Sequence, residues 1–203
     1  MRSEVYNINC MEFMKTLPDK CFDILIADPP YRNMNENAPQ KEMREHGNMK
    51  TFGNKPTSEM LKEFERVSKH QIIWGANNFD YPFKGFVAWD KKVRGSDRYS
   101  QVEIASLSES LATTSKFVAI SCYDKKGKIH PSQKPIELYE WLLLNYASQG
   151  WVIFDPMFGS GSSRIAAHKL GYDYVGCEID KNFFDKAEER FKQETSQLSL
   201  FNI

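Results

Sequence analysis

The chain has few of the residues that crosslink a protein or anchor it in a membrane. It contains only four cysteines in 203 residues, with no Cys-x-x-Cys pair and no Cys/His cluster. Such scattered cysteines argue against a zinc site or a disulfide framework, and they fit a reducing cytoplasm. No apolar run is long enough to span a bilayer, and the residues after Met1 do not resemble a signal peptide. We therefore expect a cytoplasmic protein without a membrane partner.

The chain also has no net charge, since Lys and Arg total 27 and Asp and Glu total 27. This balance argues against a strongly cationic, non-specific nucleic-acid binder, although it allows a local basic patch. The length suits one α/β domain with modest insertions, so residues 1–203 are predicted to form a single domain.

Apolar runs and helical periodicity alternate along the chain. Strands are expected at 5–8, 22–27, 72–74, 86–89, 102–107, 117–122, 151–154 and 174–179. Helices are expected at 11–17, 58–69, from Pro135 as the first helical residue, at 163–170 and at about 181–194. The alternation predicts an α/β fold with a mostly parallel sheet and helices on both faces. Residues 32–57 are polar and poor in large aliphatic side chains, which predicts a mobile loop or lid.

Two Asp-Pro motifs each follow a strand-like apolar run. Asp28-Pro29-Pro30-Tyr31 follows Phe22–Ala27, and the second motif, which begins at Asp155, follows Val152-Ile153-Phe154. Each is therefore expected at the C-terminal edge of the sheet, where open α/β sheets bind ligands.

The second motif continues into Phe158-Gly159-Ser160-Gly161, a strand–turn–helix with two glycines. Glycines there allow a cofactor to approach the backbone, and Glu178, about 20 residues further on, has the spacing of a ribose-binding acid. Arg164 replaces the third glycine of the dinucleotide fingerprint, so S-adenosylmethionine, which has a ribose but no phosphate, fits better than a dinucleotide. The alternative is an ordinary glycine turn.

The first motif suits chemistry on an exocyclic amine, whose lone pair is delocalised into the ring. The Asp28 carboxylate and the Pro29 carbonyl are adjacent acceptors for its hydrogens, and Pro30 removes a competing N–H. Tyr31 is predicted to stack on the base for about 1–3 kcal/mol, which offsets part of the few kcal/mol needed to extrude a base from a duplex. The alternative is a rigid turn after a strand.

With these motifs in this order, the chain resembles the amino-type DNA methyltransferases, specifically the adenine-N6 branch with permuted motif order (the β group). His130-Pro131-Ser132-Gln133-Lys134-Pro135 is similar to that family's His-Pro-Thr-Gln-Lys-Pro element. The resemblance implies a Rossmann-like S-adenosylmethionine-dependent methyltransferase fold with Asp28, Pro29 and Tyr31 as catalytic residues. The cofactor-binding residues that it implies are Asn9, Lys134, Asp155, Phe158, Gly159, Ser160, Gly161 and Glu178. Asn9 departs from the usual acid, and Ser163 from the usual threonine.

We therefore predict a site-specific DNA adenine-N6 methyltransferase. The nearest alternative is a cytosine-N4 enzyme, which usually carries serine in place of Asp28; a non-catalytic DNA-binding relative is another. Protein-glutamine and RNA methyltransferases with Asn-Pro-Pro-Tyr normally place the cofactor motif first. Cytosine-C5 methylation is set aside because it needs a nucleophilic cysteine, normally after proline, and no cysteine here follows proline.

DNA recognition is expected within about 32–125, a stretch that leaves little room for a separate recognition domain. A short target site, loose specificity or a second subunit, such as a homodimer, could each account for this, and a restriction partner stays open. The basic residues expected to contact phosphates are Lys41, Arg44, Lys50, Lys91, Lys92, Arg94 and Arg98.

The C-terminal tail, about 195–203, carries a second resemblance. Residues 197–201 are similar to the peptide by which bacterial proteins bind the replicative sliding clamp. The residues that this resemblance implies are Gln197, Leu198, Leu200 and Phe201. The alternative is that these apolar side chains fold back on the core.

Overall fold

The computed structural model describes residues 1–31, 54–82, 84–93, 100–111, 114–123 and 127–196. Its strands are β1 (Ser3–Tyr6), β2 (Phe22–Ala27), β3 (Ser68–Trp74), β4 (Gly85–Asp90), β5 (Val102–Leu107), β6 (Lys116–Ala119), β7 (Val152–Asp155) and β8 (Asp173–Cys177). Its helices are α1 (Cys10–Lys15), α3 (Ser58–Val67), α4 (Ile136–Tyr146), α5 (Ser162–Lys169) and α6 (Lys181–Ser196), with a 3₁₀ turn, η2 (Ala76–Asn78).

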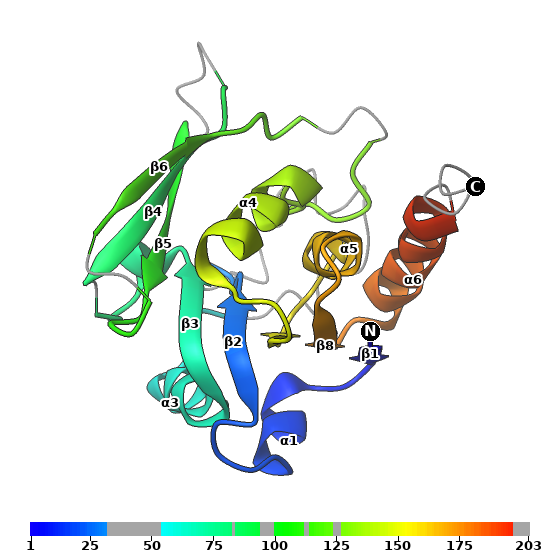
Figure 1. The fold of residues 1–203 in the computed structure, drawn as a ribbon, viewed down its shortest axis with the longest axis horizontal. Helices are drawn as coiled ribbons and strands as arrows, with labels where there is room; N and C mark the ends of the chain where they lie inside the picture. The colour runs from blue at the N-terminus through cyan, green and yellow to red at the C-terminus, as the bar shows by residue number, and fades with distance from the viewer. Residues whose placement is uncertain (32–53, 83, 94–99, 112–113, 124–126, 197–203) are drawn as a thin grey trace.

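The strands form one eight-stranded sheet in the order β1-β8-β7-β2-β3-β5-β4-β6 (Figure 1). Strand β5 is antiparallel to both of its neighbours, β3 and β4, and the remaining pairs are parallel. The predicted α/β fold with a mostly parallel sheet is therefore confirmed.

Strands β2 and β7 are direct neighbours, with Ile24 opposite Ile153 and Leu25 opposite Phe154. From β2 the chain continues to β3 on one side, and from β7 it continues to β8 on the other. Open α/β sheets bind their ligands at the carboxyl ends of strands where the order reverses in this way. Both Asp-Pro motifs start at these two strand ends.

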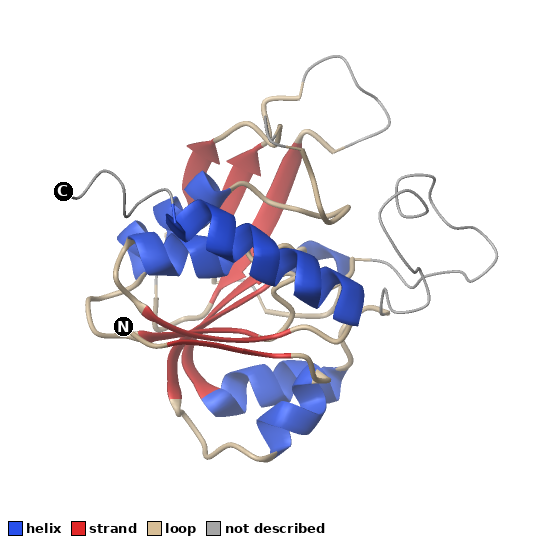
Figure 2. Ribbon diagram, turned by 90° about the vertical axis from the view of Figure 1, so that its right-hand side faces the viewer, coloured by secondary structure: helices blue, strands red, loops and turns tan. Residues whose placement is uncertain are grey.

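Helices cover both faces of the sheet (Figure 2). Alternate residues of β2 belong to different hydrophobic clusters, because successive side chains of a strand point to opposite faces. Ile24 and Ile26 pack in the cluster that holds the buried residues of α4, whereas Leu25 and Ala27 pack with those of α1 and α3. The motif that begins at Asp28 thus follows a strand that is buried on both sides.

Some boundaries differ from expectation. Pro135 caps α4 with extended backbone, ψ 147°, so that helix begins at Ile136 instead. Strand β3 begins at Ser68, before the expected Ile72, because the polar residues there still pair with β2. Its buried Gln71 amide donates to the Ser68 carbonyl oxygen at 2.9 Å, which explains how a polar side chain is tolerated inside the sheet.

The middle of the chain builds half of the sheet. Helix α3 and strands β3 to β6 lie within the expected recognition region, and Trp74 and Trp89 are core residues. These residues belong to the sheet and its core, so DNA recognition within about 32–125 is now expected only from the segments that precede or connect these elements. Of those, 32–53 and 94–99 lie outside the described residues, as do Lys41, Arg44, Lys50, Arg94 and Arg98. The four predicted clamp-binding residues, in 197–203, also lie outside them.

None of the described helices combines the length and the apolar character that a membrane span requires.

Candidate active site

Asp28 lies at the centre of a cluster of charged and hydroxyl groups just beyond the end of β2. The Lys134 Nζ is 2.6 Å from Asp28 Oδ1 and 3.1 Å from Glu103 Oε2. The Tyr31 hydroxyl lies 2.8 Å from the same Asp28 oxygen and 3.0 Å from the same Glu103 oxygen. Glu103 Oε1 is in turn 3.0 Å from the Lys91 Nζ. Two carboxylates and two ammonium groups therefore form one neutral cluster around Tyr31.

The Tyr31 hydroxyl is held from three sides. It accepts a hydrogen bond from Lys134 Nζ at 3.0 Å, and its single proton can be donated to only one of the two carboxylates at a time. The ring lies against Gly75, where a Cβ would come within 2.1 Å of the ring carbons. Gly75 also has φ +68°, a conformation that favours glycine. The glycine that follows β3 thus makes room for the Tyr31 ring.

Burial and charge act differently on the two acids. Burial raises the pKa of Asp28 above its usual range, with Lys134 opposing and the Glu103 charge adding to the increase. Burial also acts to raise the pKa of Glu103, but Lys134 and Lys91 outweigh it and lower that pKa to about 2. The pKa of Lys134 is raised because its two acidic neighbours outweigh its burial. Asp28 is therefore the more easily protonated acid.

The glycine loop and the predicted ribose acid are directly connected. Gly159 N–H donates to Glu178 Oε2 at 3.0 Å, and Asp180 N–H donates to Glu178 Oε1 at 2.8 Å. Burial raises the pKa of Glu178, and these backbone N–H groups limit that rise. Gly159 and Gly161 both have positive φ, 49° and 73°, as expected of a loop that a ligand approaches closely.

Segment 130–135 joins the two motifs. The Lys134 carbonyl accepts a hydrogen bond from Ser162 Oγ at 2.7 Å, while the side chain of the same residue reaches Asp28. The His130 ring lies about 3.4 Å from the point where a Cβ of Gly159 would stand, and it packs edge-on against Phe183. Lys134 thus contacts the start of α5, directly after the glycine loop, through its backbone and contacts Asp28 through its ammonium.

Asp155 lies inside the protein. Its carboxylate accepts hydrogen bonds from Ser163 Oγ at 2.6 Å and from Met157 N–H at 3.1 Å, and burial raises its pKa to about 7. Serine at position 163 fills this role although threonine is usual there. The contacts position the loop after β7, and direct binding of a cofactor by Asp155 stays a prediction.

The other predicted cofactor residues surround the same edge of the sheet. Asn9 caps α1 by accepting from Met11 N–H at 2.8 Å. Phe158 N–H donates to the Cys177 carbonyl at 3.0 Å, and Ser160 Oγ lies 3.2 Å from Ser162 Oγ. Their contacts with a cofactor stay predictions.

Sequence reasoning missed Asn7 and Glu103. The Asn7 amide donates to the Glu178 and Ile179 carbonyls at 2.8 and 3.2 Å, which fixes the loop that carries the predicted ribose-binding acid. Glu103 lies in β5. The one feature of the sequence that could have drawn attention to it is a charged residue between Val102 and Ile104, within a run that is otherwise apolar or small.

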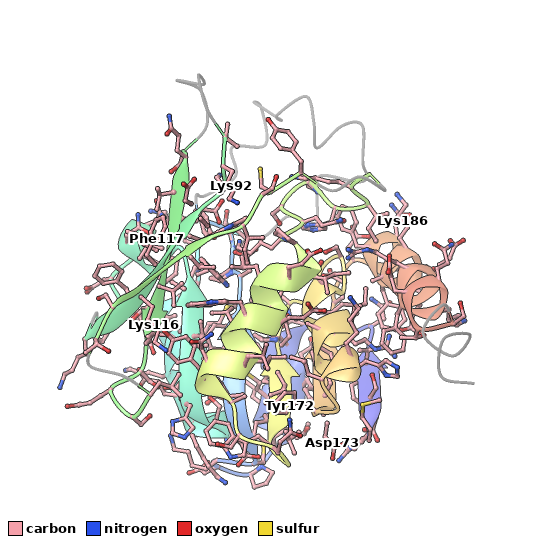
Figure 3. The ribbon with its side chains drawn as sticks, turned by 45° about the horizontal axis from the view of Figure 1, so that its top comes forward. Lys92, Lys116, Phe117, Tyr172, Asp173 and Lys186 are labelled. Atoms are coloured by element: carbon pink, nitrogen blue, oxygen red, sulfur yellow. The ribbon has the colours of Figure 1, made fainter. Side chains whose placement is uncertain are left out.

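Of the predicted phosphate contacts, only Lys91 and Lys92 lie among the described residues. Lys91 is paired with Glu103 at 3.0 Å. Lys92 has φ 56°, rare for a residue with a side chain, and its N–H donates to Asp90 Oδ1 at 2.7 Å. In Figure 3, Lys92 lies at the end of the molecule opposite Asp173, the first residue of β8. It is therefore on the active-site side of the sheet.

The donor set at this edge fits a nucleoside better than a metal. The buried Glu178 carboxylate can accept from ribose hydroxyls, and the positive-φ glycines leave the loop backbone open to close approach. Within the described residues, no three His, Cys, Asp or Glu side chains are grouped in a way that could hold a metal ion.

The sequence model of the DNA methylase family that comprises N6 and N4 methyltransferases matches residues 73–189, more than half of the chain. This chain belongs to that family. The methylase is 24% identical over 243 residues to the type II methyltransferase M.HinfI of Haemophilus influenzae, covering 91% of this chain and 67% of the relative. It is 22% identical over 244 residues to the type II methyltransferase M2.MboI of Moraxella bovis, and the match covers 96% of this chain and 89% of the relative.

Solved structures share the fold of the methylase. The complex of M1.HpyAVI with SAM has a TM-score of 0.61 at 18% identity and covers 92% of this chain and 98% of its own. The PvuII cytosine-N4-specific DNA methyltransferase has a TM-score of 0.63 at 10% identity, and the match covers 97% of this chain and 92% of that structure. The fold is thus present in a cytosine-N4 enzyme, so the fold does not decide which base is methylated.

Proposed function

We propose that this methylase is a site-specific DNA adenine-N6 methyltransferase that uses S-adenosylmethionine. The observation that carries the proposal is that one residue links the two motifs: the Lys134 ammonium pairs with Asp28, and its carbonyl accepts from Ser162, the residue that follows the glycine loop. A base amine on Asp28 would therefore face a cofactor held over Gly159–Gly161. The family membership supports methyl transfer to DNA, and the choice of base rests on Asp28.

Asp28 and Pro29 act on the nitrogen that receives the methyl group. The cofactor supplies an electrophilic methyl group on a sulfonium. The Asp28 carboxylate and the Pro29 carbonyl accept the two amine hydrogens, which draws the nitrogen towards tetrahedral geometry and exposes its lone pair. Because positioning supplies most of the rate of such in-line transfers, the fixed backbone of Pro29-Pro30 matters as much as the charge.

The nitrogen must lose one proton when it gains the methyl carbon. Asp28 is the nearest acceptor, and burial has already raised its pKa, which makes it a better base than an exposed aspartate. Tyr31 is anchored through its hydroxyl, and its ring is proposed to stack on the extruded base.

Asp28 favours adenine over cytosine, since cytosine-N4 enzymes that resemble this chain usually have serine there. Cytosine-N4 methylation remains the second candidate because its chemistry and fold are the same.

The proposal is tested by incubating the purified methylase with DNA and radiolabelled S-adenosylmethionine, digesting the DNA to nucleosides and separating them. The label should be found in N6-methyl-2′-deoxyadenosine. Label in N4-methyl-2′-deoxycytidine would support the second candidate, and unlabelled DNA with folded protein that binds the cofactor would support a non-catalytic relative.

Glu178→Gln should weaken cofactor binding about tenfold, the cost of losing a hydrogen bond to a charged group. Glutamine has one side-chain oxygen for two backbone N–H donors, so it also disturbs Gly159 or Asp180. Glu189→Gln is the matched control, because Glu189 is an exposed acid of α6 that accepts a hydrogen bond from Gln193 Nε2 at 3.2 Å. Calorimetric titration with S-adenosylmethionine measures both, and an unchanged Kd for Glu178→Gln would remove the ribose assignment.

A further inference from the structure

Glu103 contacts both of the groups that contact Asp28. It stands in β5, and one of its oxygens lies 3.1 Å from Lys134 Nζ and 3.0 Å from the Tyr31 hydroxyl. Its other oxygen is paired with Lys91 at 3.0 Å. The side chain is 20% exposed, so this carboxylate is largely removed from water. Nothing in the mechanism above uses it.

The geometry at Asp28 raises a conflict that Glu103 can resolve. Lys134 and Tyr31 are both bound to Asp28 Oδ1, and the ammonium at 2.6 Å holds on that oxygen part of the negative charge on which the substrate amine must also draw. The Lys134 side chain is only 4% exposed, and a buried ammonium with one acidic partner would stay on that partner. Glu103 offers a second acid at hydrogen-bonding distance, so Lys134 can shift its pairing when the amine arrives.

We propose that Glu103 is a positioning residue for methyl transfer, which holds Lys134 and Tyr31 so that Asp28 is free to accept the substrate amine. The inference rests on the proposed role of Asp28 in amine methylation. Lys91 neutralises the second oxygen of Glu103 and thereby keeps the four-charge cluster neutral. Lys91 would then act inside the active site, in place of or in addition to the predicted phosphate contact.

Charge coupling gives this role a recognisable signature. Lys134 lowers the pKa of Asp28, whereas Glu103 raises it. Asp155 from β7 and Tyr139 from α4 are the other described ionisable groups that are electrostatically coupled to Asp28, and Tyr31 is hydrogen-bonded to it. Removing the Glu103 charge should therefore lower the pKa of Asp28 while leaving Lys134 held by Asp28 alone.

Glu103→Gln should lower kcat at least about tenfold, because Lys134 then competes with the amine for Asp28. The acid limb of the pH–rate profile should move to lower pH, because Asp28, with a lower pKa, stays ionised at lower pH. KM for DNA and cofactor affinity should stay within about twofold, because Glu103 is placed at the catalytic acid and not at the glycine loop. Glu109→Gln is the matched control, since that exposed acid pairs with Lys84 at the far end of β5.

Two further variants separate positioning from a structural contribution. In a Lys134→Met background, Glu103→Gln should change kcat less than about twofold, since residues that act through one another are not additive. Lys91→Met should move the acid limb to higher pH, opposite to Glu103→Gln, because it removes a positive charge from the cluster. Lys91→Met also provides this test if Glu103→Gln does not fold, as judged by its melting temperature.

The proposal is wrong if Glu103→Gln turns over within twofold of wild type, if neither variant moves the acid limb, or if Glu103→Gln and Lys134→Met act independently. In each of these outcomes the wild-type protein still makes N6-methyladenine. A failure of the proposed function is different, because wild-type protein then makes none at any pH.

Discussion

Replacing Asp28 by alanine should reduce methyl transfer by about a thousandfold or more, the upper range for removing a preorganised group that stabilises developing charge. Cofactor affinity should stay within about twofold, because Glu178 and the glycine loop, which are proposed to bind the cofactor and contact each other, are unchanged. Single-turnover methylation with saturating DNA and cofactor measures the first quantity, and calorimetric titration measures the second.

The fold should survive this change. Lys134 keeps Glu103 as a partner at 3.1 Å, so no buried ammonium is left unpaired. Asp19→Asn is the control. Asp19 lies between α1 and β2, at the opposite end of β2 from Asp28, and it is an exposed acid that pairs with Arg66 of α3. Near-normal turnover by Asp28→Ala would show that the proposed mechanism is wrong.

Replacing Gly75 by alanine should lower activity about tenfold to a hundredfold, because a misplacement of about 1 Å in a catalytic group has effects of that size. The new Cβ would lie 2.1 Å from the Tyr31 ring, so the ring must move and carry its hydroxyl away from Asp28 and Glu103. The positive φ adds about 1–2 kcal/mol of backbone strain.

Gly171→Ala separates these two effects. Gly171 has φ +77° but no atom within 4 Å of its added Cβ, so this variant carries the backbone strain alone. Gly75→Ala should lose at least as much stability as Gly171→Ala in thermal or denaturant unfolding, because it adds the displaced ring to the same backbone strain, and only Gly75→Ala should lose activity. Equal activities for the two variants would contradict the assigned position of Tyr31.

The sequence was most informative where local pattern and a general rule of α/β sheets act together. Phe22–Ala27 and Val152–Phe154 are apolar enough to identify buried strands, and an Asp-Pro step ends each run. Because the carboxyl ends of parallel strands lie at one edge of a sheet, Asp28 and Asp155 could be predicted at the same edge without knowledge of the strand order.

The contacts of the acid cluster could not be predicted in the same way. Tyr31 and Glu103 are 72 positions apart, and they meet only because β5 inserts antiparallel between β3 and β4. Neither strand order nor register can be read from composition. Lys134 was predicted beside the cofactor, and its carbonyl does contact Ser162, directly after the glycine loop. The sequence does not tell where a long flexible side chain points, so its contact with Asp28 was not predicted.

The most direct test of the central claim is to express the methylase in bacteria that lack DNA methylation and to map modified bases along the chromosome. The account predicts N6-methyladenine at one recurring short sequence in cells with the wild-type protein, and none in cells with Asp28→Ala. N4-methylcytosine at the recurring sequence, or N6-methyladenine that persists in the Asp28→Ala cells, would contradict it.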